Sequence, residues 1–138
     1  MSELVRLSFT IERSLCRRME KLMRKSRRKN RSEFIRDLLR SRLVEEEWKE
    51  DREALGTITL VYNHEQRYLS HKLTSAQHHH HDAVLATTHV HLDEHTCAEM
   101  IMVRGYPRVI EHVAEELRQQ KGVLHAAVSI SSTGKELT

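Results

Sequence analysis

The sequence predicts an α+β chain in two parts, a short strand-helix-helix unit followed by a β-α-β-β-α-β unit. Two observations carry this prediction. Apolar residues recur with a period of either two or about 3.6 residues, in segments that follow one another in this order. The charge also divides, because residues 1–44 hold 14 Lys and Arg against 5 Asp and Glu, whereas residues 45–138 hold 9 against 15. We therefore expect a basic, anion-binding unit joined to an acidic unit with another role.

Composition restricts the class of protein further. The chain has 138 residues, of which 38% are hydrophobic and 4% aromatic, so its core is modest and we expect an oligomer. The two cysteines, Cys16 and Cys97, do not provide a disulfide framework. No run of about 18 apolar residues occurs. We expect a cytoplasmic protein with no membrane partner, in which reduced thiols can bind metal.

Residues 4–11, LVRLSFTI, alternate between apolar and polar side chains, which predicts a strand with one buried face. The exposed face carries Arg6, Ser8 and Thr10, whose polar groups can read base edges in DNA. One short strand is not stable alone, and no second strand lies nearby in sequence. We therefore expect the same strand of a second copy to pair with it.

Two helices follow this strand. Apolar residues take helical spacing over residues 12–25. Asn30 and Glu33 then fit a capping box at the start of a second helix, which is predicted to reach about residue 50. Arg36 lies early in this helix and could bind a DNA phosphate.

The rest of the chain alternates between strand and helix patterns. Residues 45–55, EEEWKEDREAL, are predicted to be a helix tail or a linker. The strands that follow are predicted at residues 57–64, 82–92, 97–103 and 123–131, and the helices at 65–77 and about 107–121. This order is that of the ferredoxin-like, split β-α-β unit. The assigned ranges are 1–50 for the first unit, 51–55 for a linker, 56–133 for the second unit and 134–138 for a tail.

Seven of the eleven histidines lie within residues 77–97, together with one cysteine. His89 and His91 are two apart in a strand, so both rings project from one face, and the returning strand can place Cys97 beside them. Glu99 shares the face of Cys97 and could orient a ligand. The opposite, apolar row of the same strand is expected to meet the core; its members are Val84, Ala86, Thr88, Val90 and Leu92. Imidazole and thiolate ligands suit nickel, copper or zinc, and spacing alone does not choose among them.

The nearest candidates for a fourth ligand are the four histidines at residues 78–81. At about 3.3 Å per residue, His78 lies roughly 35 Å along an extended chain from His89. It does not easily reach its own hairpin, but it could reach that of a neighbouring chain across a symmetric interface. The alternative is a patch of solvated histidines with no metal role.

The chain resembles known families over most of its length. Its N-terminal third, and above all NRSEFIRDLL, resembles a ribbon-helix-helix DNA-binding domain. From Arg6 to about Ser131 the chain resembles the nickel-responsive repressors of the NikR family, most specifically in NRSEFIRDLL, QHHHHD, THVHLDEHTC and KGV. One departure is the turn KSRRKN between the first two helices, which lacks the glycine expected there.

The resemblance implies a repressor of nickel uptake with an ACT-like second domain that forms a homotetramer, a dimer of dimers. It implies one square-planar Ni(II) per chain, with the partner subunit's His78 as fourth ligand; the other ligands would be His89, His91 and Cys97. It also implies that the ribbon reads a palindromic operator in double-stranded DNA through Arg6, Ser8 and Thr10. Glu33 and Asp37, one helical turn apart, could hold a second cation, although a cap and a surface charge explain them equally well.

Two other functions stay open at this point. HVHLDE resembles a weak HxHxxE signature of cupin-like metalloenzymes, although 4 Gly and 1 Pro are few for the turns of a jelly roll. A metal-independent ribbon-helix-helix regulator would leave the convergence of histidine and cysteine unexplained. We expect a regulator and not an enzyme.

Overall fold

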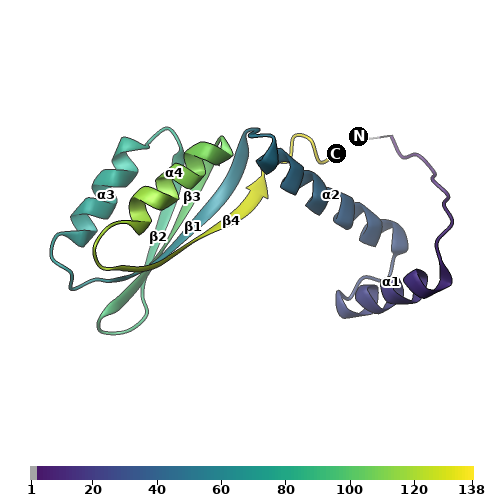
Figure 1. The fold of residues 1–138 in the computed structure, drawn as a ribbon, viewed down its shortest axis with the longest axis horizontal. Helices are drawn as coiled ribbons and strands as arrows, with labels where there is room; N and C mark the ends of the chain where they lie inside the picture. Colours follow the sequence, from purple (N-terminus) through teal and green to yellow (C-terminus); the bar gives the residue numbers. More distant parts are fainter. Residues whose placement is uncertain (1–2) are drawn as a thin grey trace. The chain divides into compact units, whose positions relative to one another are not determined.

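The structure, a computed structural model, describes residues 3–138 of the chain. Residue contacts divide the chain into two units, Met1–Leu43 with Glu136–Thr138, and Val44–Lys135. None of the helices in the described range is both long enough and apolar enough to cross a membrane. The elements in chain order are α1 (Arg13–Lys25), α2 (Arg31–Lys49), β1 (Ala54–Asn63), α3 (Leu69–His79), β2 (Val84–His91), β3 (Thr96–Gly105), α4 (Pro107–Arg118) and β4 (Val123–Ser132) (Figure 1).

The helices α1 and α2 confirm the predicted helix pair, and Asn30 caps the second of them. Asn30 Oδ1 accepts a hydrogen bond from the backbone N–H of Ser32 at 2.9 Å, as an N-cap residue does. In the turn without glycine, Arg27 takes a left-handed conformation with φ 57°. The N–H of Arg28 then bonds the carbonyl of Met23 at 2.9 Å. The turn therefore keeps the helix-ending geometry usual for glycine, at a cost of about 1–2 kcal/mol.

The strand predicted over residues 4–11 is absent from the single chain, because residues 3–12 form no hydrogen-bonded ladder. A strand needs a neighbour, and the predicted neighbour is the same segment of a second copy. Few side chains of the first unit are buried in the single chain. Among its described apolar side chains, only Met23 and Phe34 are buried. The large apolar side chains left exposed are Leu4, Val5, Leu7, Phe9, Leu15, Leu22, Leu38, Leu39 and Leu43. One chain thus leaves the first unit without a closed core.

The second unit has the predicted β-α-β-β-α-β order, with an antiparallel sheet in the order β2-β3-β1-β4. Its boundaries differ from the prediction. The first strand begins at Ala54, three residues early, because the alternation of buried residues continues to that position. The helix α3 begins at Leu69, four residues late, because Asn63 Oδ1 accepts the N–H of Glu65 at 2.9 Å and forms a turn.

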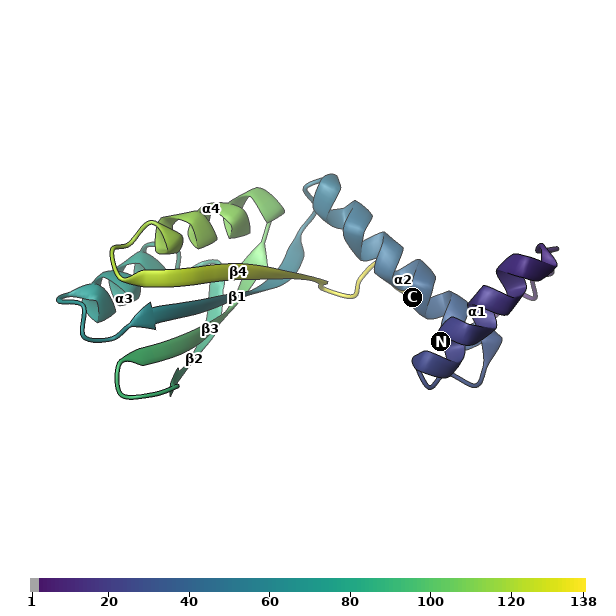
Figure 2. The same ribbon diagram turned by 60° about the horizontal axis from the view of Figure 1, so that its bottom comes forward.

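Both α3 and α4 cover the same face of this sheet, and the core lies between them and the strands (Figure 2). Alternate residues of β1 are buried, which places their side chains under the helices. The largest fully buried side chains are Tyr62, Ile58, Leu60, Leu69, Leu73, Ile101, Ile110, Leu117, Val103, Val113 and Cys97. The other face of the sheet is not covered within the described part of this chain, and we call it the open face.

The prediction that the apolar row of β2 meets the core is wrong for most of its members. Val84 pairs with Val103 and packs against the core. The register then shifts between Val84 and Ala86, and a shift of one residue exchanges the two faces of a strand. Beyond this irregularity the apolar row points to the open face, where Val90 is 44% exposed. The imidazoles on β2 therefore lie on the helix-covered side.

Candidate metal centre

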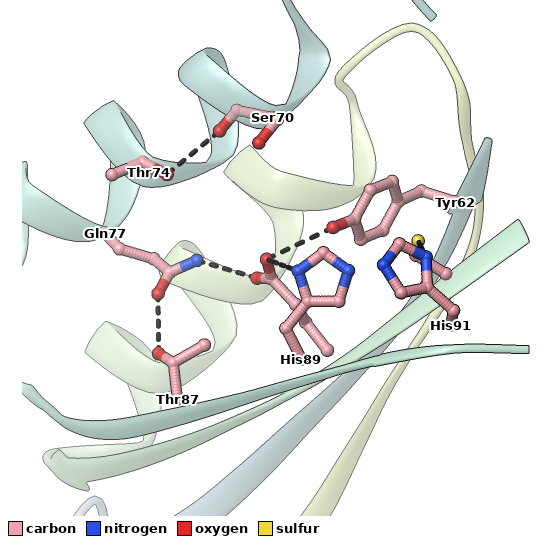
Figure 3. A network of polar contacts seen from close by, with 9 residues as sticks. Tyr62, Ser70, Thr74, Gln77, Thr87, His89 and His91 are labelled. Carbon is pink, nitrogen blue, oxygen red and sulfur yellow. Dashed lines mark hydrogen bonds and ion pairs between the residues drawn. The ribbon is translucent and has the colours of Figure 1, made fainter. Parts of the chain in front are cut away.

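The structure brings His89, His91 and Cys97 together at the end of the β2–β3 hairpin. One ligand atom from each lies within 4.8 Å of the other two. Cys97 Sγ is 3.2 Å from His91 Nδ1, and the two imidazole ring centroids are 5.2 Å apart (Figure 3). The backbone sets this arrangement, because His91 pairs with Cys97 and His89 with Glu99 in the antiparallel register.

The hairpin turn is fixed by Asp93. Its Oδ1 accepts the backbone N–H of His95 at 2.8 Å and that of Thr96 at 2.7 Å. These two hydrogen bonds are the main reason that the pKa of Asp93 lies below its ordinary value. The N–H of Leu92 also bonds the carbonyl of Thr96 at 2.8 Å. Side-chain and backbone contacts thus hold the start of β3, and Cys97 with it, against the end of β2.

Glu99 lies beside His89 and is only 9% exposed. Its Oε1 is 4.0 Å from His89 Nδ1 and accepts a hydrogen bond from the Tyr62 hydroxyl at 3.3 Å. Its Oε2 accepts a hydrogen bond from Gln77 Nε2 at 3.0 Å. A carboxylate held in this way can orient an imidazole whose other nitrogen binds a metal.

Three members of this polar network were missed by sequence reasoning: Tyr62, Gln77 and Thr87. The Thr87 hydroxyl donates to Gln77 Oε1 at 2.7 Å, and so completes a line of contacts from β2 to α3 and on to Glu99 (Figure 3). For Tyr62 a signal existed, since its hydroxyl follows two buried aliphatic residues in the alternation of β1. A buried tyrosine hydroxyl needs a partner. For Gln77 and Thr87 the sequence carries no comparable signal.

The Cys97 thiol is fully buried, and burial raises its pKa; the carboxylates of Asp93 and Glu99 raise it further. Burial likewise raises the pKa of Tyr62, with Glu99 as the next cause. The raised pKa keeps the thiol protonated while no cation is bound. Since the thiolate is the form that binds metal, the thiol loses its proton when a cation compensates the thiolate charge. The carboxylates of Asp93 and Glu99 attract a cation, so the site favours a cation by charge as well as by ligand type.

The donor set fits a divalent nickel ion. Two imidazoles and a thiolate are ligands that nickel, copper and zinc accept. For the bond lengths that zinc shows, about 2.0 Å to nitrogen and about 2.3 Å to sulfur, two ligand atoms of one ion lie about 3.1 to 3.5 Å apart at right-angle or tetrahedral geometry. The 3.2 Å between His91 Nδ1 and Cys97 Sγ lies in that range, so both atoms can bind one divalent ion.

His78 lies apart from these three ligands. It is exposed on the last turn of α3, where it lines a shallow hollow with Thr74, Gln77, His81 and Val84. Among residues 3–138, the group of ligand atoms within 4.8 Å at the hairpin does not include it. A fourth protein ligand from His78 would therefore have to come from another chain.

The residues predicted to contact DNA are all exposed. Arg6, Ser8 and Thr10 lie in the segment before α1, and Arg36 lies on α2. Their exposure leaves them accessible to a large ligand, and the single chain does not arrange them as a ribbon.

The predicted second cation pair is only partly available. Glu33 is exposed in the first turn of α2. Asp37, by contrast, pairs with Arg28 at 2.8 Å and with Arg40 at 3.7 Å. A cation bound there would have to displace both guanidinium groups from the carboxylate.

The fold removes one of the alternative functions. Cupins are built on a jelly roll of eight strands in two sheets. The described residues instead form one four-stranded sheet with helices on a single face. The HVHLDE segment therefore does not lie in the setting that a cupin-like metalloenzyme requires.

Comparison with protein families gives two matches. Residues 5–46 match the ribbon-helix-helix protein, copG family, and residues 55–131 match the NikR C terminal nickel binding domain. A solved structure of an uncharacterised protein from Thermotoga maritima is similar with a TM-score of 0.52 and 12% identity. It covers 57% of this chain and 98% of its own length, and it supports the fold alone.

Curated relatives are similar over nearly the whole chain. Proteins of Geotalea uraniireducens and Geobacter sulfurreducens are each 46% identical over 138 residues, which covers 99% of this chain and 99% of theirs. A protein of Caldanaerobacter subterraneus is 43% identical over 135 residues, covering 97% of this chain and 88% of its own. All three carry the provisional name nickel-responsive regulator.

Proposed function

The chain belongs to the NikR family of nickel-responsive regulators, and from this premise we propose that it is a nickel-dependent, DNA-binding transcriptional repressor of nickel uptake genes. The observation that carries the proposal is the convergence of His89, His91 and Cys97 within 4.8 Å. The protein would act in the cytoplasm by binding and not by catalysis.

The nickel site would be completed between chains. Each chain would bind one Ni(II) in a square plane through its two hairpin imidazoles, the Cys97 thiolate and the partner subunit's His78. The exposure of His78 at the end of α3 supports this arrangement, since an exposed imidazole is accessible to a second molecule. Glu99 would keep the His89 ring in the orientation that ligation needs.

We assign oligomer formation to two surfaces, one in each unit. The exposed apolar side chains of the first unit would be buried between two chains, which pair their N-terminal strands as a ribbon. The open face would pack against the open face of another chain. It carries a hollow lined by Thr57, Ala86, Thr88, Met100 and Met102. Together the two surfaces give a homotetramer, a dimer of dimers.

The ribbon would read DNA in the major groove through Arg6, Ser8 and Thr10, while Arg36 binds a phosphate. A two-fold symmetric pair of heads fits a palindromic operator. Nickel binding between chains would favour the head placements that match both half-sites. This is allostery in the strict sense, with two sites, two states and a coupling free energy.

The direct test is an optical Ni(II) titration of the purified metal-free protein. We expect one nickel per chain with thiolate-to-nickel charge-transfer absorption, lost in Cys97→Ala and much reduced in His89→Ala. The matched control is His95→Ala, which removes an exposed imidazole of the same hairpin that pairs with Glu65. Weak, multiple binding without that absorption would contradict the site and leave the histidine run as a chelating patch.

Reading of DNA is tested separately with Arg6→Ala. This variant should bind nickel normally and lose discrimination between operator and unrelated DNA at fixed salt. Normal discrimination would show that the ribbon is not the reader. The comparison separates loss of DNA reading from loss of metal binding.

A further inference from the structure

A second group of metal-binding side chains lies on the two helices of the second unit. His80 ends α3 as its C-cap residue, and His112 and Glu116 lie one turn apart on α4. One ligand atom from each lies within 4.8 Å of the other two. His80 Nε2 is 2.7 Å from Glu116 Oε2, and the His80 and His112 rings meet edge to face with centroids 5.7 Å apart. The group shares no residue with the candidate nickel site.

The fold holds these side chains in place before any metal arrives. The helices α3 and α4 contact each other over the sheet (Figure 1). Residues four apart in a helix, such as His112 and Glu116 on α4, present their side chains on one face. The carbonyl of His80 accepts the N–H groups of Ala83 at 2.9 Å and Val84 at 3.0 Å. The His80 backbone is thereby fixed between α3 and β2, which lowers the entropic cost of ligation.

The surroundings of the group suit a cation that water can still reach. The side chains of His80 and Glu116 are 21% and 34% exposed, so they are shielded but accessible. The C-terminal end of α3 adds partial negative charge near His80. Two imidazoles exclude magnesium and calcium as preferred ions, since these take oxygen ligands. Two imidazoles and one carboxylate, with a fourth position for water, form a donor set that zinc accepts.

We propose that His80, His112 and Glu116 bind one Zn(II) per chain, within a single chain and separately from nickel. The alternative without metal is a hydrogen-bonded pair of His80 and Glu116 that needs no third side chain. The two differ in His112, which a metal site requires and the pair does not. The proposal does not depend on the proposed function, because it involves neither the hairpin ligands nor another chain.

The first experiment is a calorimetric Zn(II) titration of the full-length chain carrying His89→Ala and Cys97→Ala, which removes the candidate nickel site. We expect one zinc per chain in this background. Adding His112→Ala or Glu116→Gln should weaken zinc binding by at least about tenfold. The matched controls are His71→Ala on α3 and Glu111→Gln on α4, which are exposed and outside the group. Unchanged binding in the His112 and Glu116 variants would overturn the proposal and point to the histidine run.

A second experiment reports ligation directly and does not depend on a loss of affinity. In the same background, Cys16→Ser and His112→Cys leave one thiol in the chain, at position 112. With Co(II) as probe, we expect thiolate-to-cobalt charge-transfer absorption at one equivalent, lost again in Glu116→Gln. Cobalt bound without that absorption would show that position 112 is not a ligand.

Discussion

Gln77 donates a hydrogen bond to Glu99, with 3.0 Å between Nε2 and Oε2. The bond joins the last turns of α3 to the strand that carries Cys97. Glu99 also faces His89, and Gln77 immediately precedes His78 in the sequence. In the proposed tetramer, one carboxylate therefore connects the hairpin ligands of a chain to the helix end that supplies a ligand to the partner's site.

Loss of this bond should weaken nickel binding and leave the proposed tetramer intact. In Gln77→Ala we expect the nickel affinity, measured by competition with a chelator, to fall by about 10- to 100-fold. The reason is that Glu99 loses one of its two donors and orients His89 less firmly. Gln119→Ala at the C-cap of α4, which removes an exposed amide bound to Glu115, is the control. Equal affinities in the two variants would show that the bond has no part in metal binding.

Nickel affinity should rise with pH because the Cys97 thiol must lose its proton. Burial raises the pKa of this thiol, so in the metal-free protein it is protonated at neutral pH. Below that pKa, each pH unit should raise the affinity by about tenfold through this group alone. Titrations at several pH values measure the slope, with alkylation of the metal-free thiol expected to be slow. A pH-independent affinity, or rapid alkylation at neutral pH, would contradict the assignment.

A charge on the open face should separate the dimers of the proposed tetramer. Met100 is 50% exposed there and lines the hollow, so Met100→Glu places a carboxylate in the proposed interface. We expect analytical ultracentrifugation to find dimers, because burial of an unpaired charge costs several kcal/mol. Lys72→Glu, on an exposed position of α3, should leave the tetramer intact. A tetramer that survives Met100→Glu would place the interface elsewhere.

The hairpin turn should lose its stabilisation by Asp93 in acid. Its hydrogen bonds to two backbone N–H groups lower the pKa of this carboxyl in the folded state. The stabilisation is therefore complete above the unfolded pKa of about 3.9 and is lost as pH falls through the lower folded value. Urea unfolding of Asp93→Ala should show a lower midpoint than the parent at pH 6.5, and the difference should shrink below pH 4. A constant difference across that range would assign the effect to packing instead of charge.

Periodicity predicted the order of the elements because each segment carries its own apolar spacing. The same local logic found the cap at Asn30, since a cap involves neighbouring residues only. The irregularity after Val84 was not predictable in this way, because it depends on how β3 pairs with β2. It reversed the face expected for the apolar row, yet His89, His91 and Cys97 still share one face, since their relative register lies beyond it.

The same limit applies to groups assembled from distant parts of the chain. His80 and Glu116 lie 36 residues apart, and nothing in either segment indicates the other. Residues of the hairpin could be grouped from sequence because a short turn joins them. Groups that meet across packed helices need the tertiary structure, as does the contact of Gln77 with Glu99.

The strand β2 stands at the edge of the sheet, with β3 as its single neighbour in the described chain. An edge strand is held by one ladder and opens more readily than the strands inside a sheet, so its amides are expected to exchange with solvent early. Two of the proposed nickel ligands, His89 and His91, thus lie on an edge strand, and a metal that joined them to Cys97 would hold this strand to β3. In the proposed function, nickel would therefore stabilise the edge that β2 offers to another subunit, while the inner strands keep their two ladders each.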